Sequence, residues 1–558
     1  MTDINKLITD NIDVWTNAIS SKASTGRGSN KKVEFTGIKS LRNLILELAV
    51  QGKLIKVDNS GVNPQNLLDQ ILDAKKELIR QKKLKKQKSL PPLSEEEVLF
   101  QAPKGWIWAR LGEVTNYGVA DKAEPTSVDD DCWVLELEDV EKSTSRLLKR
   151  VRFSERNFKS SKNRFVSGDV IYGKLRPYLD KVIVADEAGV CTTEMIPFRA
   201  YANLDSRFLR LLMKTPYFID YANNSTHGMN LPRMGTDKAR LAPILIAPIE
   251  EQKLIVKKVD ELMSLCDQLE QQTEASIDAH QLLVEELLST LTNSENAQDF
   301  EQNWARIAEH FDLLFTTEHS IEQLKQTILQ LAVMGKLVPQ DPTDEPASKL
   351  LERIAQEKEQ LIKDKVIKKQ PAYKASPLMK EFEIPTGWAQ VSLGEIIQVS
   401  SGDGLTSRQM NPEGDIPVFG GNGINGYHDS HNVEKQTLVI GRVGFYCGSV
   451  HITPSKAWIT DNAFNTYFSE ENIDINFLSW LLKATDLAQN NNATAQPVIS
   501  GKKIYPLRVL LPPLKEQKHI SIKIHELYGI CELLKDSITE ASHTNVQLSE
   551  AVVGKALS

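Results

Sequence analysis

Long hydrophobic runs and paired cysteines are both missing from this sequence. No uninterrupted apolar run approaches the ~20 residues that a membrane-spanning helix needs, and the start MTDINKLITDN lacks the apolar core of a signal peptide. The five cysteines lie far apart and form no CxxC pair, which argues against a disulfide framework or a zinc knuckle. We therefore expect a soluble protein that works in a reducing cytoplasm and makes no contact with a membrane.

Complete catalytic motifs are missing as well, although two kinds of fragment invite comparison. Phe419 to Gly423 fits the F-x-G-x-G cofactor loop of amino-methyltransferases, but no N/D-P-P-Y/F tetrapeptide accompanies it, so a turn-rich recognition loop is the better interpretation. The Glu-Gln-Lys triplets that begin at Glu251 and Glu516 match the end of a nuclease signature, yet each lies where a helix is predicted to begin, a position that favours glutamate. We predict no catalytic residue in this chain.

Ligands for a metal ion or a phosphate group are equally incomplete. His428 and His431 have no cysteine or third histidine near them in sequence, so a surface loop explains them better than a metal site. The glycine-lysine pairs that begin at Gly52, Gly335 and Gly554 lack the earlier glycine and the following serine or threonine of a phosphate-binding loop. We predict no metal site and no cofactor bound by this chain.

What the sequence does contain is one segment present twice. Residues 41–54 read LRNLILELAVQGKL and residues 324–337 read LKQTILQLAVMGKL, with nine of fourteen positions identical at an offset of 283. Both copies place apolar residues at helical spacing and then reach a glycine-lysine pair, where glycine readily caps a helix and lysine suits its negative end. Two equivalent helices therefore begin two equivalent halves.

Further repeated marks extend the duplication along the chain. PKGW at residues 103–106 corresponds to PTGW at 385–388, and APIEEQK from Ala247 corresponds to PPLKEQK from Pro512 at an offset of 265. Repeated borders around dissimilar inserts indicate one scaffold that carries two different domains, because solenoid repeats are only about 20 to 50 residues long. Short strand-like runs between Gly and Pro residues predict a mixed α/β (α+β) fold for each insert.

A long helix with an apolar seam is predicted after each insert. The seam alternates steps of three and four residues, as in a coiled coil, over about 40 residues or roughly 60 Å, and it continues through Leu283 and Leu548. Its central residues are Val259, Leu262, Cys266, Leu269, Ile524, Leu527, Cys531 and Leu534. We predict that the two helices pair antiparallel and separate the two inserts.

The second long helix reaches the C-terminus with no short repeated helix after it. The partner that it lacks is the short helix near Leu41, so the chain is predicted to be a pseudo-twofold cyclic repeat with neighbouring termini. The predicted segments are a polar, loosely attached leader (1–37), a short helix with a basic helical linker (38–104), the first insert (105–250), a central helical region (251–340), a second helical linker (341–384), the second insert (385–514) and a C-terminal helix (515–558).

Charge is distributed unevenly. The net charge of −7 does not indicate nucleic-acid binding, but residues 142–181 contain twelve Lys or Arg against three acids. Residues 388–513 contain eight basic and eleven acidic residues, which weakens a purely electrostatic account of binding by the second insert. The basic runs 80–88 and 350–370 are either arms that touch DNA phosphates or solvated helix faces, and both interpretations stay open.

Together these features resemble the specificity subunit of type I restriction-modification systems. The resemblance covers roughly residues 38–557. Its marks are the GW-x-x-x-x-LGE entries from Gly105 and Gly387, the YGKLRPYLDKV element from Tyr172, GGNGINGY from Gly420, the P-x-x-EQ exits from Pro248 and Pro513, and the AV-x-GKL helices. The order and duplication of these marks carry the resemblance, because each mark alone is weak.

The resemblance implies a non-catalytic, sequence-specific DNA-binding chain with two target recognition domains, each reading one half of a split target in double-stranded DNA. It also implies two modification subunits that dock on the helices and methylate adenine with S-adenosylmethionine, and restriction subunits that use ATP and Mg to translocate and cut DNA. The helices would then set the spacer between the two half-targets, as half-site spacing does in dimeric regulators.

The candidate DNA contacts are basic, amide and tyrosine side chains in the two inserts, since such groups bind phosphates and base edges. They are Arg152, Lys162, Arg164, Tyr172, Lys174, Arg176, Tyr178, Asn230 and Arg233 in the first insert, and Arg408, Asn422, Asn425, Tyr427, Arg442, Lys456, Lys502 and Lys503 in the second. Nearby acids such as Asp169 and Asp180 could instead neutralise some of them. Two other classes of function stay open, a coiled-coil scaffold that binds only proteins and a self-contained DNA methyltransferase or nuclease.

Overall fold

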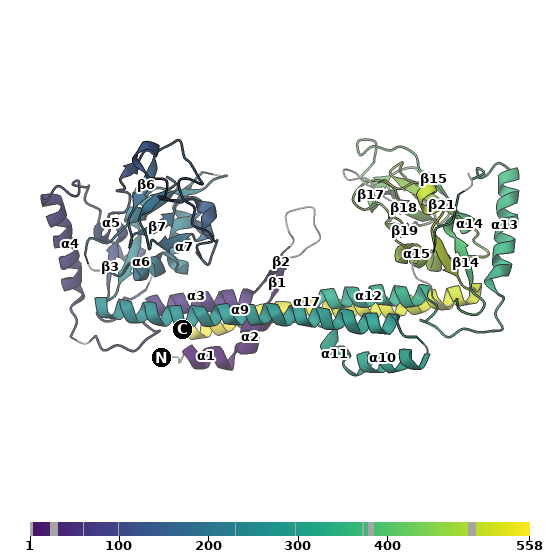
Figure 1. The fold of residues 1–558 in the computed structure, drawn as a ribbon, viewed down its shortest axis with the longest axis horizontal. Helices are drawn as coiled ribbons and strands as arrows, with labels where there is room; N and C mark the ends of the chain where they lie inside the picture. The colour runs from purple at the N-terminus through teal and green to yellow at the C-terminus, as the bar shows by residue number, and fades with distance from the viewer. Residues whose placement is uncertain are drawn as a thin grey trace. The chain divides into compact units, whose positions relative to one another are not determined.

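The computed structural model describes residues 4–22, 32–59, 61–98, 100–202, 204–228, 230–295, 297–370, 373–377, 384–488 and 498–558. The chain divides into two compact units, of which unit 1 comprises Met1–Ser276 and Ala541–Ser558 and unit 2 comprises Ile277–Glu540. Each unit contains one mixed α/β domain, which we call the first head (residues 105–250) and the second head (residues 385–514) (Figure 1). Among the described residues, no helix is both long and apolar enough to cross a membrane.

The two predicted long helices are present as α9 (Ile249–Thr292) and α17 (Leu514–Leu557), each of 44 residues. Six of the eight central seam residues are at most 6% exposed, and Leu527 and Leu534 are partly buried. The seam of α9 up to Leu269 belongs to the core of unit 1, and the seam of α17 from Ile520 to Ile538 belongs to the core of unit 2. The pairing of α9 with α17 as a coiled coil stays a prediction.

The predicted seam is wrong near the C-terminal end of both long helices. Leu283 and Leu548 are 51% and 46% exposed, whereas the next residues, Val284 and Ser549, are 2% and 0% exposed. The error falls on equivalent positions because a helix of 3.6 residues per turn drifts about 20° per heptad against a seam of period 3.5. The buried side of each helix therefore advances by one residue.

The duplicated short helices are α3 (Thr36–Val50) and α12 (Glu318–Val333), and each ends before a glycine in the left-handed region. The sequence led us to expect that the lysine after each glycine would interact with the C-terminal end of its own helix. In the structure it bonds to a different helix. Lys53 Nζ donates to the carbonyl of Leu557 at 2.7 Å, and Lys336 Nζ donates to the carbonyl of Thr292 at 3.2 Å. Each lysine thus satisfies a carbonyl at the C-terminal end of a long helix in its own unit.

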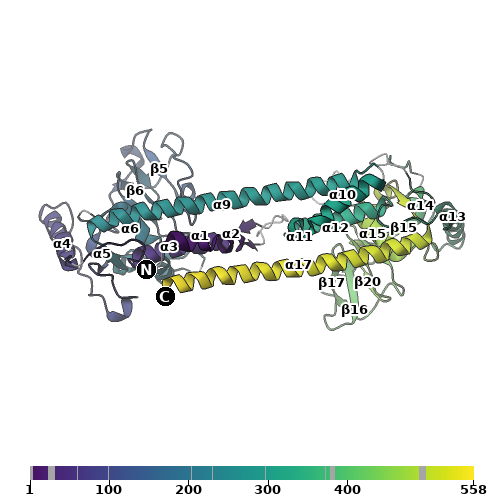
Figure 2. The same ribbon diagram turned by 90° about the horizontal axis from the view of Figure 1, so that it is seen from below.

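The lysine contacts repeat at an offset of 265, because Leu557 corresponds to Thr292. In unit 1 the Lys53 contact places the last turn of α17 beside the end of α3, close to the start of the chain (Figure 2). Ser542 Oγ adds a donation to the carbonyl of Ile19 at 2.7 Å. The expectation that the two ends of the chain lie near each other agrees with these contacts, whereas the twofold relation between the units stays a prediction.

The leader is not loosely attached. It forms α1 (Ile4–Asp10), α2 (Ile12–Asn17) and an antiparallel pair of strands, β1 (Ser20–Lys22) and β2 (Lys32–Glu34), while residues 23–31 of the predicted loop lie outside the described residues. Ile4 and Ile8, one turn apart on α1, and Trp15 on α2 are at most 5% exposed and belong to the core of unit 1, although polar residues surround them in the sequence. In unit 2, two helices, α10 (Ala297–Glu309) and α11 (Phe311–Leu314), precede α12, as α1 and α2 precede α3 in unit 1.

The first head is enclosed by strands β3 and β13, which pair antiparallel, and its described residues also form the two-stranded antiparallel sheet of β11 and β12 and two larger sheets. One sheet has the order β4-β6-β9-β5 with β5 and β9 parallel, and the other has the antiparallel order β10-β7-β8. The strands are β3 (Ile107–Arg110), β4 (Lys122–Ala123), β5 (Trp133–Leu135), β6 (Lys162–Phe165), β7 (Val170–Gly173), β8 (Val182–Val184), β9 (Gly189–Cys191), β10 (Met195–Phe198), β11 (Thr226–His227), β12 (Arg233–Met234) and β13 (Pro243–Ile246).

The first head also contains the helices α5 (Leu111–Val114), α6 (Ser206–Met213), α7 (Pro216–Asn224) and α8 (Thr236–Leu241), together with the 3-10 turns η2 (Pro125–Ser127), η3 (Leu137–Asp139) and η4 (Pro177–Leu179). The sequence pattern of residues 206–221, SRFLRLLMKTPYFIDY, predicts one continuous helix, but the structure has two, α6 and α7. Pro216 causes the break, because proline cannot continue a helix but suits the first position of a new one.

The second head repeats this plan with its own sheets. Strands β14 and β22 pair antiparallel at its border, and the sheets have the orders β15-β21-β18-β19 and β17-β16-β20. The strands are β14 (Ala389–Ser392), β15 (Ile397–Ser401), β16 (Ile416–Gly420), β17 (Gly423–His428), β18 (Leu438–Gly441), β19 (Val450–Ile452), β20 (Trp458–Ile459), β21 (Ala463–Phe468) and β22 (Arg508–Leu511). The helices are α14 (Leu393–Ile396), α15 (Ile475–Ala484) and α16 (Gly501–Ile504).

The predicted helical linkers contain α4 (Pro64–Arg80) and α13 (Ala347–Lys363). Lys75 donates to the carbonyl of Gly112 at 2.9 Å, and Lys358 donates to the carbonyl of Gly394 at 2.5 Å. Burial lowers the pKa of both lysines, that of Lys358 to about 8. Each linker helix is therefore attached to its own head, and a contact of the basic runs with DNA stays a prediction.

Candidate nucleic-acid interface

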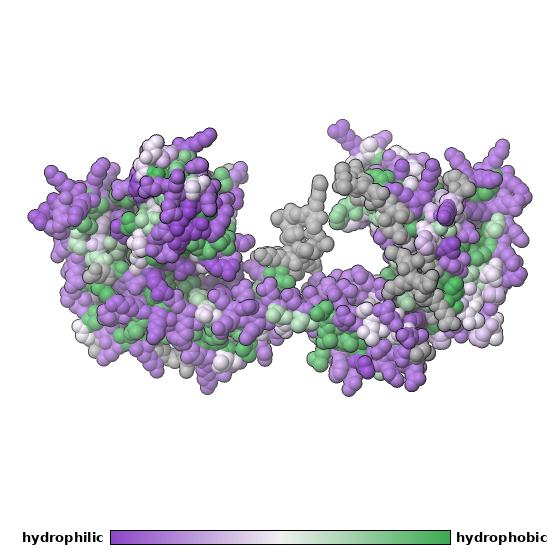
Figure 3. All heavy atoms as spheres, viewed as in Figure 1, coloured by the Kyte–Doolittle hydropathy of each residue, from purple (hydrophilic) through white to green (hydrophobic). Residues whose placement is uncertain are grey.

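The basic stretch 142–181 is largely neutralised inside the first head. Arg150 and Arg152 both pair with Glu187, Arg156 pairs with Asp139, and Lys162 pairs with Glu136. All three acids lie apart from their partners in sequence, so the local excess of positive charge predicted more free cations than the fold leaves. The viewed surface of each head is mainly hydrophilic, with small scattered apolar areas (Figure 3).

Two segments of the first head bring five candidate residues together. The backbone N–H of Arg176 donates to the carbonyl of Pro232 at 2.7 Å, and Leu175 forms an antiparallel bridge with Arg233. Lys174, Arg176 and Tyr178 come from the β7–β8 connection, Asn230 comes from the β11–β12 connection, and Arg233 begins β12. This cluster contains a lysine with no side-chain partner among the described residues and a tyrosine that is 51% exposed.

Arg176 and Asp180 give the β7–β8 turn its shape. Both residues lie in the left-handed region, with φ of 50° and 49°, a conformation that costs a non-glycine residue roughly 1 kcal/mol. Burial raises the pKa of the Asp180 carboxyl to about 6, although Lys214 lies in direct ion-pair contact and opposes that rise. Arg176 Nε is buried without a hydrogen-bond partner in the described structure.

The same turn occurs between β18 and β19 of the second head. Gly444 and Gly448 have φ of 95° and 92°, and they follow β18 at the positions that Arg176 and Asp180 occupy after β7. Val443 bridges Val498 as Leu175 bridges Arg233.

Two exposed aromatic residues on this turn were not among the candidate DNA contacts predicted from the sequence. Phe445 is 69% exposed and Tyr446 is 54% exposed. The signal that could have found them is an ungapped alignment of residues 170–182 with 438–450, at an offset of 268.

The burial and ion pairs of several candidates in the first head argue against a role in DNA contact. Tyr172 is 2% exposed and packs edge-on against Phe218, so its prediction as a surface contact is wrong. It belongs to β7, all four residues of which are buried. Lys162 is 9% exposed, and the guanidinium of Arg152 is held by Glu187, so both are committed to acids within the head. Arg164 is exposed and donates to the hydroxyl of Ser127 at 2.7 Å.

Arg233 is half-exposed and also engages an acid, since its Nε lies 3.0 Å from a carboxylate oxygen of Glu194. Asn230 is exposed beside it. The cation with the fewest competing partners in this cluster is therefore Lys174.

In the second head the candidates divide between free and engaged side chains. Arg442 donates to the hydroxyl of Ser401 at 3.2 Å, and its guanidinium lies 5.5 Å from the ring centre of Phe464. Lys503 donates to the carbonyl of Val498 at 3.0 Å. The remaining candidates are exposed, namely Arg408, Asn422, Asn425, Tyr427, Lys456 and Lys502.

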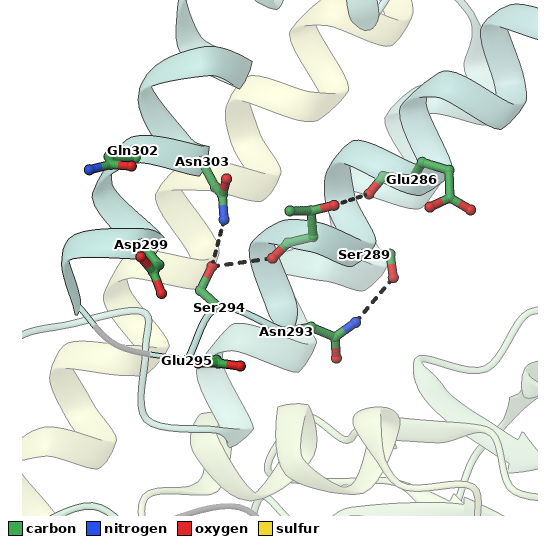
Figure 4. Close-up of a pocket in the computed structure, with 9 residues that line it drawn as sticks. Glu286, Ser289, Asn293, Ser294, Glu295, Asp299, Gln302 and Asn303 are labelled. Carbon is green, nitrogen blue, oxygen red and sulfur yellow. Dashed lines mark hydrogen bonds between the residues drawn. The ribbon is translucent and has the colours of Figure 1, made fainter.

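Asn425 also lines a polar hollow of about 800 Å³ with residues 404–410 and 460–462. A second hollow, of about 520 Å³, lies where α9 ends beside α10 (Figure 4). Three carboxylates, Glu286, Glu295 and Asp299, line it together with hydroxyl and amide groups, and its described lining contains no lysine or arginine. This chemistry does not suit a polyanion such as DNA. The hollow in the second head is therefore the better placed of the two for a nucleic acid.

The fragments that resembled catalytic motifs have structural partners. Gly420 pairs with Gly423, so Gly421 and Asn422 form the tight turn of the β16–β17 hairpin. The indole N–H of Trp106 donates to Glu251 at 2.9 Å, and that of Trp388 donates to Glu516 at the same distance. Each glutamate therefore joins the entry of a head to the first turn of a long helix.

The glutamine of each Glu-Gln-Lys triplet is also used inside the structure. Gln252 accepts a hydrogen bond from the backbone of Asp205 at 2.9 Å, and Gln517 accepts one from the backbone of Asp474 at 2.9 Å. His431 lies 3.5 Å from Glu434, and the ring of His428 packs against Trp458.

The two tryptophan-glutamate pairs differ in their third partner. Asn59 donates to Glu251 at 2.7 Å in unit 1, whereas a carboxylate, Asp344, lies near Glu516 in unit 2. Burial raises the pKa of Glu516 to about 7, the hydrogen bond from Trp388 opposes the rise, and the charge of Asp344 adds to it. Unit 2 therefore holds a carboxyl that titrates near neutral pH.

Comparison with known proteins assigns this arrangement to one family. Residues 385–542 match the family model described as the type I restriction modification DNA specificity domain. The chain is 36% identical to the type I restriction enzyme EcoEI specificity subunit of Escherichia coli over 598 aligned positions, covering 100% of both chains. The EcoAI specificity subunit of the same organism is also 36% identical over 100% of both chains.

A solved structure supports the fold. A chain from a study of complex assembly and conformational transition of the type I R-M system superposes with a TM-score of 0.52 at 19% identity. The superposition covers 82% of this chain and 99% of that chain.

Proposed function

The chain belongs to the family of type I restriction-modification specificity subunits, and we propose that it is the non-catalytic DNA-reading subunit of such a complex. In this proposal each head recognises one half of a bipartite target in double-stranded DNA. The observation that carries it is that both heads present the same turn, after β7 and after β18, with a cation at its start and an exposed tyrosine within it. Cations bind phosphates and aromatic rings bind bases, so the turn suits a nucleic acid.

The residues around that shared turn account for different half-targets. In the first head the neighbouring loop contributes Asn230 and Arg233, whose amide and guanidinium groups can pair with adenine and guanine edges. In the second head the neighbouring exposed groups are those of the β16–β17 hairpin, including Asn422 and Asn425. Shared positioning with different base-reading groups is what two independent half-targets require.

The partner proposal rests on the repeated framework. Two equivalent short helices, α3 and α12, end at equivalent glycine-lysine pairs, so the chain offers two equivalent surfaces. We assign one modification subunit to each, with S-adenosylmethionine bound there rather than here. Restriction subunits, with ATP and Mg, would join that complex in the cytoplasm.

In this proposal the long helices set the length of the spacer between the two half-targets. A helix of 44 residues is about 66 Å long at 1.5 Å per residue, which exceeds one turn of DNA at ~34–36 Å. Two heads attached to such helices could bind half-targets a fixed distance apart. The proposal makes no use of catalytic groups in this chain, and the glutamates that resembled a nuclease motif are engaged by tryptophans.

The test is an exchange of the first head. Residues 107–247 are replaced by the corresponding residues of the EcoAI specificity subunit, the variant is produced with the modification subunits, and methylated adenines are mapped across the genome. One half of the methylated sequence is expected to change while the other half is kept. Loss of all sequence preference in the unaltered complex would favour a protein-binding scaffold, and methylation by this chain alone would favour a self-contained methyltransferase.

A further inference from the structure

The turn between β18 and β19 exposes two adjacent aromatic side chains to solvent. Phe445 and Tyr446 are 69% and 54% exposed, and their rings lie 5.1 Å apart in an edge-to-face arrangement. Burying an aromatic side chain stabilises a protein, so leaving two adjacent rings in water forgoes that stabilisation. Such exposed apolar groups usually mark a surface that is covered by a partner.

The backbone holds the two rings in a defined place. Cys447 N–H donates to the carbonyl of Gly444 at 3.1 Å, and Ser449 N–H donates to the carbonyl of Tyr446 at 3.1 Å. At the base of the turn, a Cβ on Gly441 would lie 2.2 Å from the carbonyl oxygen of Gly421, so only glycine allows this close approach. The turn is thus braced against the β16–β17 hairpin and presents its rings at little conformational cost.

The first head presents the same turn with a single ring. Aligned without gaps at an offset of 268, Tyr178 corresponds to Tyr446 and Lys174 corresponds to Arg442. Tyr178 is 51% exposed. The left-handed positions also correspond, although the first head places Arg176 and Asp180 where the second has glycines. The first head keeps this shape although the left-handed conformation is unfavourable for both non-glycine residues, which indicates that the shape itself is used.

What the two heads share must face what their targets share. The half-targets differ in base sequence, but both are duplex DNA with stacked bases and charged phosphates. A cation at the start of the turn and a tyrosine four residues later match these two features, since aromatic rings stack on any base and cations bind any phosphate. Arg442 lies at the base of the turn, directly before the Val443 bridge to Val498 and three residues before Phe445.

We propose that Phe445 and Tyr446 form an aromatic wedge that enters the DNA at the half-target of the second head and partly unstacks one base step, with Tyr178 making the corresponding single-ring contact in the first head. Apolar side chains that enter between base steps kink the duplex in this way. This inference rests on the proposed function, because it names the residues through which the heads touch the bases.

The first experiment measures DNA affinity of the full complex with the modification subunits. Phe445→Ala and Tyr446→Ala are each expected to weaken binding to the target about tenfold, since stacking contributes about 1–3 kcal/mol per base. The slope of affinity against salt should stay the same, because no phosphate contact is removed. Tyr446→Phe should retain the affinity, and Leu313→Ala, which truncates a 71% exposed side chain outside the head, serves as the matched control.

The second experiment places 2-aminopurine at successive positions of the half-target. Its fluorescence should rise at one base step when the unaltered complex binds and should stay low with the Phe445→Ala, Tyr446→Ala double variant. A complex that binds its target specifically, with unchanged affinity in the variants and no rise at any position, overturns the wedge but leaves the proposed function intact. Failure of the unaltered complex to select any sequence overturns the proposed function instead. Loss of complex assembly in the variants, measured by gel filtration, would show that the rings contact a protein and would also overturn the wedge.

Discussion

Lys53 donates to the backbone carbonyl of Leu557, 504 residues farther along the chain, at 2.7 Å. Lys336 donates to the carbonyl of Thr292 in unit 2, so a lysine caps the C-terminal end of both long helices in the same way. A helix leaves its last carbonyls without partners inside the helix, and a lysine there offsets both the missing hydrogen bonds and the negative end of the helix dipole. In unit 1 this device ties the end of the chain to its first repeated helix.

Lys53→Met should loosen the end of α17, because the carbonyl that loses its partner must turn to water. We expect the free energy of unfolding of unit 1 to fall by about 1 kcal/mol, with faster amide exchange over residues 550–557 by hydrogen-exchange mass spectrometry. Lys336→Met should have the equivalent effect on residues 285–292 and none on the end of α17. Lys56→Met, on an exposed side chain just beyond, is the control. Unaltered exchange in both variants would mean that the lysines do not cap the helices.

The buried carboxyl of Glu516 should make unit 2 sensitive to pH. Its pKa in the folded protein is about 7 against an ordinary 4.5, so the folded state holds a proton that the unfolded state has lost in this range. The contribution to stability is present below pH 4.5 and is lost as the pH rises from 4.5 through 7. Thermal unfolding followed across this range should show the decline.

Asp344→Asn should reduce that pH dependence, because it removes the charge that adds to the effect of burial on the pKa of Glu516 and places an amide near Glu516, as Asn59 is near Glu251 in unit 1. The variant should stabilise unit 2 by roughly 1 kcal/mol at pH 8, since an amide donor replaces a repelling carboxylate. The reciprocal change, Asn59→Asp, should introduce the same pH dependence into unit 1. Equal pH profiles for the wild type and the Asp344→Asn variant would contradict this account.

Lys174→Ala should weaken DNA binding about equally for target and non-target sequences and reduce the salt slope by ~0.9, if the lysine meets a phosphate. Arg152→Ala is the matched comparison within the same basic stretch. Its guanidinium is held by Glu187, so DNA affinity should stay unchanged while the head loses stability. The reverse pattern would show that the ion pairs, rather than Lys174, face the DNA.

Arg176→Gly should separate stability from binding. Glycine occupies the corresponding left-handed position, Gly444, in the second head, so the change should stabilise the first head by up to about 1 kcal/mol. If the guanidinium contacts DNA, affinity for the target should nevertheless fall. A variant that is more stable and binds equally well would remove Arg176 from the interface.

Lengthening both long helices by four residues should lengthen the spacer of the target. The insertions follow Glu274 in α9 and Thr539 in α17, two equivalent exposed positions away from the buried ends of the helices. Four residues add ~6 Å and about 1.1 turns, so each head keeps its face while the half-targets move apart by one or two base pairs. Methylome sequencing that finds the original spacing at full efficiency would show that the helices do not set the spacer.

Much of the framework could be predicted from the sequence because its signals are local and occur twice. The helices α3, α9, α12 and α17 follow from apolar periodicity, and the duplication of LAV-x-GKL and EQK made each copy support the other. The leader was misjudged for the opposite reason, since Trp15 and its apolar neighbours are few and are spread among polar residues. The seam was lost near Leu283 because period 3.5 and period 3.6 differ too little to separate over one heptad.

The interface depended on partners that the sequence does not bring together. Composition identified a basic stretch, but only the fold could show that Glu187 neutralises Arg150 and Arg152 and that Tyr172 faces the core. The exposed pair Phe445 and Tyr446 was passed over because an apolar side chain in a sequence is expected to be buried.

By itself, the sequence determined that the chain is duplicated, where each half begins and ends, and which helices join them, because backbone periodicity and capping act over a few residues. Only the tertiary structure decided which charges are free, which aromatic rings reach the surface and which carboxyl, Glu516 beside Asp344, titrates near neutral pH. Those properties depend on burial and on pairs formed between distant segments, and the energy of such pairs depends on distance in space rather than along the chain.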